Sequence, residues 1–400
     1  MSVPLDRLYH YLADVVNHDL VIYRWAPHGS RKLEDLTLLR AGYQDDWAMM
    51  VCHDQEPLNS TLYSSMDFDI AVGNYFQNHH GFAQFTYLTP PVVSYLASLG
   101  FRGLTSPGNQ FDQTLLLHSE QHSAEVDKFV QQGYVPVYYW SHGMIALDWF
   151  RYAEHDPVLT FDTNQIQKDF LIYNRAWAGT REYRLCFVEQ IVERQLDQHC
   201  KISFNACDVD GHYSQHKFVN PAFQITNFNL EDLLPTNIHD ATASADYCGE
   251  DYTSTAIEVV LETLFDDSRW HLTEKALRPI ACGKPFILMA TPGSLTYLKQ
   301  YGFETFAGLI DESYDQIVNP RQRLQAVVNE MTRISVLAPA VKLELYTKLH
   351  EIAKRNQRRF FGEFFDQVQQ EYVNNVEQAM TVMKQHCSGY HNAAIKKLLQ

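Results

Sequence analysis

Ten residues from His271 to Ile280, H-L-T-E-K-A-L-R-P-I, place an acid and two bases beside a proline, between two apolar runs. A carboxylate can accept hydrogen bonds from both hydroxyls of a ribose, and an ammonium group can stabilise a departing diphosphate. The same residues also suit the charged first turn of a surface helix that Thr273 caps. The apolar runs are those of two strands, I-E-V-V-L-E-T at 257–263 and P-F-I-L-M-A at 285–290. The order of strand, loop, T-E-K and strand favours a binding site over a surface helix.

A second cationic group lies in Y-N-R-A-W-A-G-T-R-E-Y-R at 173–184, where a strand is expected to enter a helix. Arg175 and Arg181 lie at this point, where helix entries and arginines both favour anions. Arg184 is instead expected to form an ion pair on a solvated face with one of two nearby glutamates, Glu182 and Glu189.

A site that transfers a group to a hydroxyl also needs a base, which accepts the proton of the attacking oxygen. Polar residues follow several expected strands of the N-terminal half, where the carboxyl ends of parallel strands form a ligand crevice. The candidate bases are Glu56, Glu120, His142 and Asp148, with His53 and Asp54 beside the first. Each alone could be a structural cap or a buried hydrogen-bonded residue, and only as a set do they indicate a site.

The expected strands are apolar throughout, which is typical of parallel sheets that are covered on both faces. They lie at 19–25, 47–54, 69–73, 114–120 and 135–140 in the N-terminal half, and at 169–175, 201–206, 257–262, 285–290 and 305–310 in the C-terminal half. Helices are expected at 180–192, at 291–303 with Gly302 at the C-terminal end, and almost throughout the chain after Pro320.

This pattern predicts an α/β protein with two Rossmann-like domains, because 400 residues exceed one ordinary core. We expect an acceptor domain at 1–158, a donor domain at 159–335, and helices at 336–400 that pack back on both domains. The linker is expected near 153–162. Two such domains facing across a cleft form the architecture called GT-B.

From Val260 to Lys275 the chain reads V-L-E-T-L-F-D-D-S-R-W-H-L-T-E-K. This stretch resembles the donor-binding motif of the α1,3-fucosyltransferases, in which F-E-N-S and a short loop precede D-Y-I-T-E-K. The wider pattern T-E-K-x-x-x-P-I-x-x-x-x-P-F-I also resembles glycosyltransferase-like proteins of large phages. The likeness is strong over about thirty residues and loose over the rest of the C-terminal half.

The resemblance implies a role for each matching residue. Glu274 would bind the ribose hydroxyls of a nucleotide-sugar, and Lys275 would bind its diphosphate. Glu262 corresponds to the glutamate of F-E-N-S, and His271 to the tyrosine that lies by the nucleotide base. Thr273 opens the T-E-K motif. An arginine in the region of Arg175 and Arg181 binds the diphosphate in that family.

The chain departs from the family at two matching positions and in the length of the loop. Thr263 replaces the asparagine of F-E-N-S, Trp270 replaces the aspartate of D-Y-I-T-E-K, and the loop carries two additional residues. These departures leave the nucleotide base, and therefore the sugar, open.

Composition narrows the other classes of function. The net charge of −16 argues against a broad nucleic-acid surface, and seven scattered cysteines without a C-x-x-C pair favour reduced thiols over disulfides or zinc. D-V-D at 208–210 is expected to form a turn, not a manganese site. No metal or cofactor is expected beyond the nucleotide-sugar itself. We find no signal peptide or membrane span and expect a cytoplasmic protein, in the host cytoplasm if the chain is viral.

The leading expectation is a metal-independent glycosyltransferase that moves a sugar from a nucleotide-diphospho-sugar to a hydroxyl, with inversion implied by the resemblance alone. The acceptor is a glycan or a lipid-linked sugar, or alternatively a hydroxymethylated base in phage DNA, which would require a basic cleft. Two alternatives of other classes are a non-catalytic nucleotide-sugar or glycan-binding protein and a nucleotide-sugar epimerase.

Overall fold

The computed structural model describes residues 3, 8–16, 19–24, 37–38, 47–52, 57–58, 114–131, 134–227, 229–230 and 244–386. The chain divides into two compact units. Unit 1 combines Met1–Ile145 with Asp366–Gln400, and unit 2 is the continuous segment Ala146–Phe365. The division lies thirteen residues before the expected boundary at 158 and separates the C-terminal helices between the units (158 − 145 = 13).

Unit 1 contains a five-stranded sheet in the order β2-β1-β3-β4-β5. Its strands are β1 (Asp19–Arg24), β2 (Thr37–Leu38), β3 (Trp47–Cys52), β4 (Thr114–His118) and β5 (Val135–Tyr138). The pairs β1/β3, β3/β4 and β4/β5 are parallel, and β1/β2 is antiparallel. The predicted strands at 19–25, 47–54, 114–120 and 135–140 are therefore confirmed, whereas the one at 69–73 lies outside the described residues.

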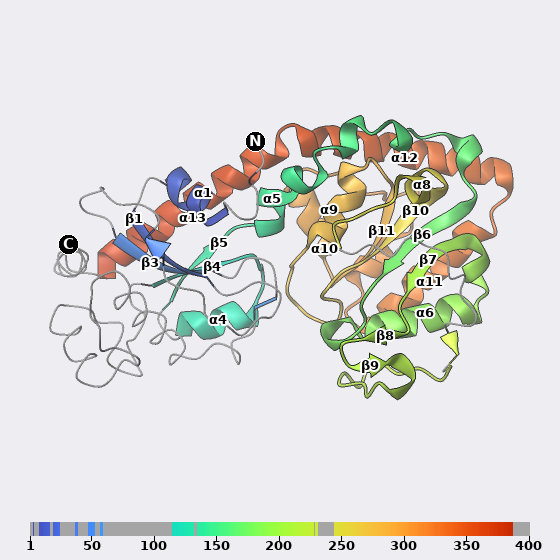
Figure 1. The fold of residues 1–400 in the computed structure, drawn as a ribbon, viewed down its shortest axis with the longest axis horizontal. Helices are drawn as coiled ribbons and strands as arrows, with labels where there is room; N and C mark the ends of the chain where they lie inside the picture. The colour runs from blue at the N-terminus through green and yellow to red at the C-terminus, as the bar shows by residue number, and fades with distance from the viewer. Residues whose placement is uncertain are drawn as a thin grey trace. The chain divides into compact units, whose positions relative to one another are not determined.

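Unit 1 includes helices from the first 145 residues and one from the C-terminal part of the chain (Figure 1). They are α1 (Leu8–Val16), α4 (Ala124–Gln131), the start of α5 (Ser141–Phe150) and most of α13 (Phe364–His386). Two hydrogen bonds fix α13 in the unit: the Tyr372 hydroxyl donates to the Leu12 carbonyl, and the Asn375 amide donates to the Tyr138 carbonyl, each at 2.9 Å.

Unit 2 contains a four-stranded parallel sheet in the order β11-β10-β6-β7, flanked by helices (Figure 1). Its strands are β6 (Lys168–Asn174), β7 (Cys200–Phe204), β10 (Thr255–Leu261) and β11 (Phe286–Met289). Every residue of β10 and β11 is buried. The largely apolar runs at these positions, in which β10 also carries Thr255 and Glu258, agree with burial on both faces of the sheet, as expected for an α/β fold.

The helices of unit 2 are α6 (Tyr183–Glu193), α8 (Gly249–Thr253), α9 (Glu274–Ala281), α10 (Ser294–Gln300), α11 (Pro320–Ser335) and α12 (Pro339–Phe361). Short 3-10 helices are η2 (Ala153–His155), η3 (Pro157–Leu159), η4 (Thr163–Gln165), η5 (Gly179–Arg181), η6 (Leu196–His199), η7 (Tyr213–Gln215) and η8 (Glu312–Gln316). The predicted helices near 180–192 and after Pro320 are confirmed. So is the helix at 291–303, which ends before Gly302 in the left-handed conformation at φ +77°.

The predicted strand at 305–310 is wrong. The chain forms a turn there, with Gly308 at φ +85°, an isolated bridge between Ala307 and Ile310, and both Leu309 and Ile310 donating backbone N–H groups to the Phe306 carbonyl. The backbone groups are thus satisfied locally. In addition, the Tyr314 hydroxyl accepts the Leu288 N–H of β11, so a side chain satisfies this backbone group.

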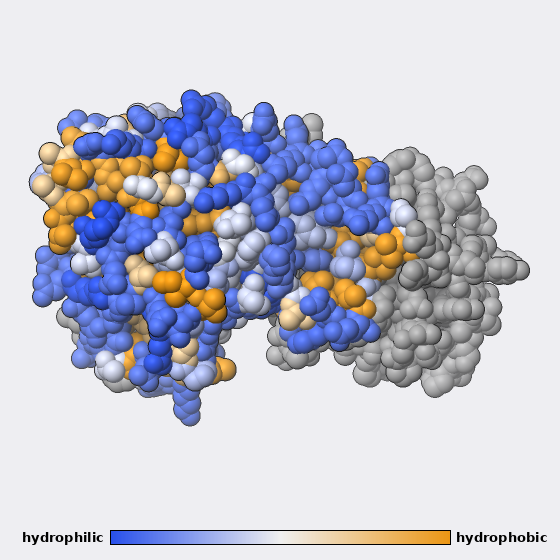
Figure 2. All heavy atoms as spheres, turned by 180° about the vertical axis from the view of Figure 1, so that it is seen from behind, coloured by the Kyte–Doolittle hydropathy of each residue, from blue (hydrophilic) through white to orange (hydrophobic). Residues whose placement is uncertain are grey.

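D-V-D at 208–210 forms the expected turn, between β8 (Cys207–Asp208) and β9 (Gly211–His212). The surface in Figure 2 is mostly hydrophilic over the described part, with hydrophobic side chains in a few patches. No described helix is long and apolar enough to cross a membrane.

Candidate functional site

The order of strands in unit 2 creates a switch point between β6 and β10. The chain passes from β6 to β7 on one side, and then returns to place β10 and β11 on the other side of β6. The connections that leave β6 and β10 therefore diverge from adjacent strands. In open α/β sheets, ligands bind outside the carboxyl ends of the strands at such a point.

The T-E-K segment lies at this edge. Thr273 caps the N-terminus of α9, and Lys275 follows in its first turn. The Lys275 ammonium lies 2.6 Å from a Glu274 carboxylate oxygen, 3.3 Å from the Thr273 hydroxyl and 3.4 Å from the hydroxyl of Thr263, two residues beyond the end of β10. The side chains of Lys275 and Glu274 are 15% and 9% exposed. A charged pair is thus held at the carboxyl end of a central strand.

Glu262 fixes the loop that leads from β10 to α9. Its side chain is fully buried. One carboxylate oxygen accepts the N–H groups of Thr273 at 3.0 Å and Ala276 at 3.2 Å, and the other accepts the Thr273 hydroxyl at 2.7 Å and the Thr263 N–H at 3.2 Å. A carboxylate at a helix N-terminus satisfies amides that have no partner within the helix. In the structure Glu262 thus positions the start of α9, on which Lys275 lies, and its contact with a donor stays a prediction.

The predicted ion pairs of Arg184 on a solvated face are wrong. Arg184 is 2% exposed, and its guanidinium donates to the carbonyls of Ala176 at 2.6 Å, Leu261 at 2.6 Å and Glu262 at 3.0 Å. The Leu261 and Glu262 carbonyls lie at the end of β10, and the Ala176 carbonyl follows β6. They need donors because the pairing of the strands stops there. Arg184 thus ties the two sides of the switch point together.

The two glutamates that were expected to pair with Arg184 hold other loops. The Glu182 carboxylate accepts hydrogen bonds from His216 Nε2 and from the N–H groups of Val219 and Asn220. The Glu189 carboxylate accepts hydrogen bonds from the N–H groups of Thr226 and Asn227. The sequence signal for this burial is the largely apolar composition of α6 around Glu189, which Glu182 directly precedes.

Arg175 and Arg181 flank the connection from β6 to α6. Arg175 is exposed, directly after β6, and Arg181 is partly exposed in η5. The Thr180 hydroxyl donates to the Thr263 carbonyl at 2.9 Å, which places η5 beside the loop that carries Lys275's partner Thr263. The structure thus brings both predicted arginines to the same sheet edge as the T-E-K segment.

Asp208 holds the backbone of this arginine connection. One of its oxygens accepts the N–H groups of Trp177 at 2.6 Å and Ala178 at 2.8 Å. Burial alone would raise the pKa of Asp208, but these donors, the Val209 N–H and the charge of Arg181 lower it below the ordinary value. The connection is therefore anchored by an ionised carboxylate.

Asn174, the last residue of β6, was not singled out from the sequence. Its side chain is fully buried, and neither its amide oxygen nor its amide nitrogen has a hydrogen-bond partner among the described residues. Buried side-chain amides are rarely without a hydrogen-bond partner in folded proteins, so the amide at this end of β6, next to the switch point, is unusual.

His271 and Trp270 differ in accessibility. His271, expected by the nucleotide base, is 2% exposed. Trp270 is partly exposed, and its indole N–H donates to the Pro292 carbonyl at 2.8 Å. The tryptophan thus presents an aromatic surface at this edge, and the histidine does not.

In unit 1, polar residues gather where β4 and β5 end. Glu120 is 3% exposed and accepts the Leu58 N–H and the Ser123 hydroxyl, each at 2.5 Å. His142 is 2% exposed, with Nδ1 at 3.3 Å from the Ser141 hydroxyl, and the Ser141 N–H donates to the Ser119 hydroxyl. Glu120 and His142 therefore belong to one buried polar edge.

Of the other predicted bases, Asp148 is described and Glu56 is not. Asp148 lies in unit 2, on the later part of α5, where it forms an ion pair with Arg151 at 3.1 Å. Asp148 lies six positions after His142, which corresponds to a rotation of about 240° around an α-helix. Glu56, with His53 and Asp54, lies outside the described residues.

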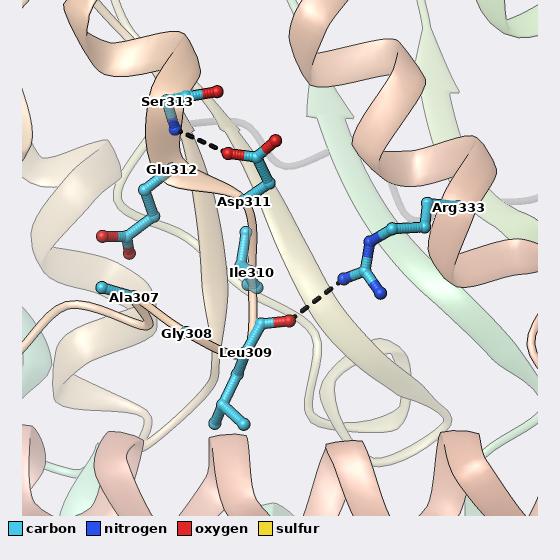
Figure 3. A pocket seen from close by; sticks show the side chains of 8 residues that line it. All are labelled: Ala307, Gly308, Leu309, Ile310, Asp311, Glu312, Ser313 and Arg333. Carbon is cyan, nitrogen blue, oxygen red and sulfur yellow. Dashed lines mark hydrogen bonds between the residues drawn. The ribbon is translucent and has the colours of Figure 1, made fainter.

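A cavity of about 510 Å³ opens elsewhere in unit 2, between the turn at 307–313 and α11 (Figure 3). Arg333 donates to the Leu309 carbonyl at 3.0 Å, and Asp311 accepts the Ser313 N–H at 3.0 Å. Arg333 also forms an ion pair with Glu330 at 2.6 Å. None of the predicted site residues lines this cavity, and its charged side chains have partners nearby: Arg333 pairs with Glu330, and Asp311 and Glu312 accept backbone N–H groups.

Within the described parts of the chain, no group of three His, Cys, Asp or Glu residues is placed to hold a metal ion. Comparison of the chain with protein-family models, curated proteins and solved structures gives no match.

Proposed function

We propose that the protein is a glycosyltransferase that uses a nucleotide-diphospho-sugar and binds it at the switch point of unit 2. The observation that carries the proposal is the Lys275–Glu274 pair at the carboxyl end of β10, with Arg175 and Arg181 on the connection from adjacent β6. A cationic edge of this kind suits a diphosphate, and a carboxylate beside it suits ribose hydroxyls.

In the proposed reaction, an acceptor hydroxyl oxygen bonds to the anomeric carbon of the sugar. The bond from that carbon to the diphosphate oxygen breaks, and the nucleoside diphosphate leaves with the electron pair. Lys275 and an arginine stabilise the charge on the leaving group without a metal ion. A base accepts the hydroxyl proton, for which Glu120 and His142 at the edge of unit 1 are the described candidates.

The proposed architecture is GT-B, with unit 2 as the donor domain and unit 1 as the acceptor domain. A parallel sheet in unit 2 and a mostly parallel sheet in unit 1, each in its own compact unit, support it. Inversion at the anomeric carbon follows from the resemblance to fucosyltransferases alone.

Thermal unfolding with UDP-, GDP-, CMP- and dTDP-sugars tests the donor site. One class of nucleotide-sugar should raise the melting temperature of the wild-type protein, because a ligand that binds only the folded state stabilises it. Lys275→Ala should abolish this rise. Lys348→Ala is the matched control, because Lys348 also forms a 2.6 Å pair with a glutamate, but on the exposed face of α12.

Product analysis separates the two functional classes. Release of the nucleoside diphosphate, accelerated by a glycan acceptor, would support transfer. Stabilisation without any turnover would instead identify a non-catalytic nucleotide-sugar-binding protein, and no stabilisation by any donor would contradict both.

A further inference from the structure

Trp270 is held rigidly at the carboxyl end of β11. Its indole N–H donates to Pro292, three residues beyond the strand, and its ring meets Tyr297 of α10 edge-on, with centroids 6.1 Å apart. The ring also packs directly on Gly293, where a Cβ atom would lie 2.8 Å from Trp270 Cζ2. A fixed ring loses little conformational freedom when a flat ligand stacks on it.

The groups along this edge follow the order of the strands. Trp270 lies at the end of β11, Glu274 and Lys275 beside the end of β10, and Arg181 on the connection that leaves β6. These strands are consecutive in the sheet, so the span between the outer two is about 10 Å. An aromatic ring, a carboxylate and two cations thus succeed one another across the edge.

A nucleoside diphosphate presents its parts in the same order: a flat base, a ribose with two hydroxyls, and two phosphates. We infer that Trp270 is the stacking platform for the nucleotide base at this site. This role replaces the one expected for His271, which is buried. The inference rests on the proposed donor site of unit 2 and adds the element that recognises the base.

Stacking on an aromatic side chain does not depend on the hydrogen-bonding edge of the base. Trp270 therefore contributes affinity for any nucleoside diphosphate and none for inorganic pyrophosphate. Lys275 contributes to both, because it acts on the phosphates. Replacement of Trp270 and replacement of Lys275 should therefore give different patterns of affinity loss for a nucleoside diphosphate and for pyrophosphate.

The test is calorimetric titration of the full-length protein with UDP, GDP, CDP and dTDP, and with inorganic pyrophosphate. Trp270→Leu should weaken the best nucleoside diphosphate about tenfold and leave pyrophosphate unchanged. Trp270→Phe should retain most of the affinity because it keeps a ring. Trp149→Leu, at a partly exposed tryptophan of α5, is the matched control and should change neither.

Pyrophosphate binding also reports whether each variant is folded at the site. Equal affinity of wild-type and Trp270→Leu proteins for the nucleoside diphosphate would overturn the stacking role alone. Parallel loss of both probes in Trp270→Leu would also overturn it, because the residue would then only support the fold. Wild-type protein that binds none of the four nucleoside diphosphates would overturn the proposed donor site and this inference together.

Discussion

The Thr180 hydroxyl donates a hydrogen bond of 2.9 Å to the Thr263 carbonyl, and this bond joins the two connections that diverge from the switch point. Thr263 in turn places its own hydroxyl 3.4 Å from the Lys275 ammonium. The two threonines therefore link the arginine connection to the lysine.

Replacement of Thr180 by valine removes this link with little change in side-chain volume. We expect Thr180→Val to weaken nucleoside diphosphate binding several-fold, because the arginine connection is no longer fixed to the loop after β10. The free energy of unfolding should fall by only about 1 kcal/mol, the net value of one hydrogen bond. Calorimetric titration and urea unfolding measure the two effects. Thr347→Val, which removes an exposed hydroxyl bond within α12, should leave binding unchanged.

Arg184 should matter more for stability than any other cation of the edge. Arg184→Lys keeps the charge but cannot reach three carbonyls with a planar fork. Because buried carbonyls would lose their donors, we expect the free energy of unfolding to fall by about 3 kcal/mol. Urea titration followed by tryptophan fluorescence checks this, with Arg151→Lys at an exposed pair as the control. A fall in the free energy of unfolding no larger than that of Arg151→Lys would contradict the role of Arg184 in joining the ends of β6 and β10.

Gly293 offers an independent way to displace the indole of Trp270. In Gly293→Ala, the new Cβ would meet the Trp270 ring at 2.8 Å, and the backbone would be strained at φ +82°. We expect weaker binding of nucleoside diphosphates and unchanged binding of pyrophosphate.

Gly308→Ala separates the contact from the strain. It imposes a similar strain at φ +85°, but its Cβ would have no neighbour within 4 Å. Both variants should lose about 1 kcal/mol of stability from strain, whereas only Gly293→Ala should affect binding. Equal effects on binding would rule out the contact as the cause.

Lys284 should make the stability of the folded chain depend on alkaline pH. It is 6% exposed, and its ammonium donates to the Tyr252 carbonyl and the Thr255 hydroxyl. Burial lowers the pKa of Lys284 from 10.5 to about 7, against the opposing charges of Glu258, Cys282 and Asp251. Between these two pH values the unfolded chain binds a proton that the folded chain does not, so this residue's contribution to the free energy of unfolding rises with pH.

The measurement is urea unfolding at several pH values from 7 to 10 in wild-type and Lys284→Met proteins. The difference between their slopes isolates Lys284 from other groups that titrate in the same range. We expect the slope to be less positive in the variant. Lys299→Met, at an exposed position of α10, should keep the wild-type slope. A wild-type slope in Lys284→Met would contradict the lowered pKa.

Much of the fold of unit 2 could be predicted because its central strands are buried on both faces. Largely apolar runs such as β10, which includes Glu258, carry that signal directly. The run at 305–310 is equally apolar, yet it forms a turn that Gly308 and local hydrogen bonds stabilise. Of this run, Phe306 and Ile310 are buried whereas Ala307 and Gly308 are exposed, so its apolar composition corresponds neither to strand pairing nor to continuous burial.

The candidate site was predictable only in part, because the function of a charged residue depends on what surrounds it. Lys275 and Glu274 lie together at a strand end, as the order of elements indicated. Arg184 and Glu262 are also charged and nearby, but they are buried and saturate backbone groups. The sequence pattern alone does not distinguish a cationic side chain that donates to backbone carbonyls from one that contacts a ligand. That distinction requires the strand order, which comes from pairing between distant segments.

The division of the chain has a consequence for its synthesis. Unit 2 is one continuous segment, whereas unit 1 needs α13, which supplies Tyr372 to α1 and Asn375 to β5. On the ribosome, the sheet of unit 1 emerges before unit 2 but lacks this helix until unit 2 has been made. Unit 2 can fold as soon as residue 365 has emerged. The segment that starts first is therefore completed last, and during that interval the surface that α13 will cover is exposed to chaperones.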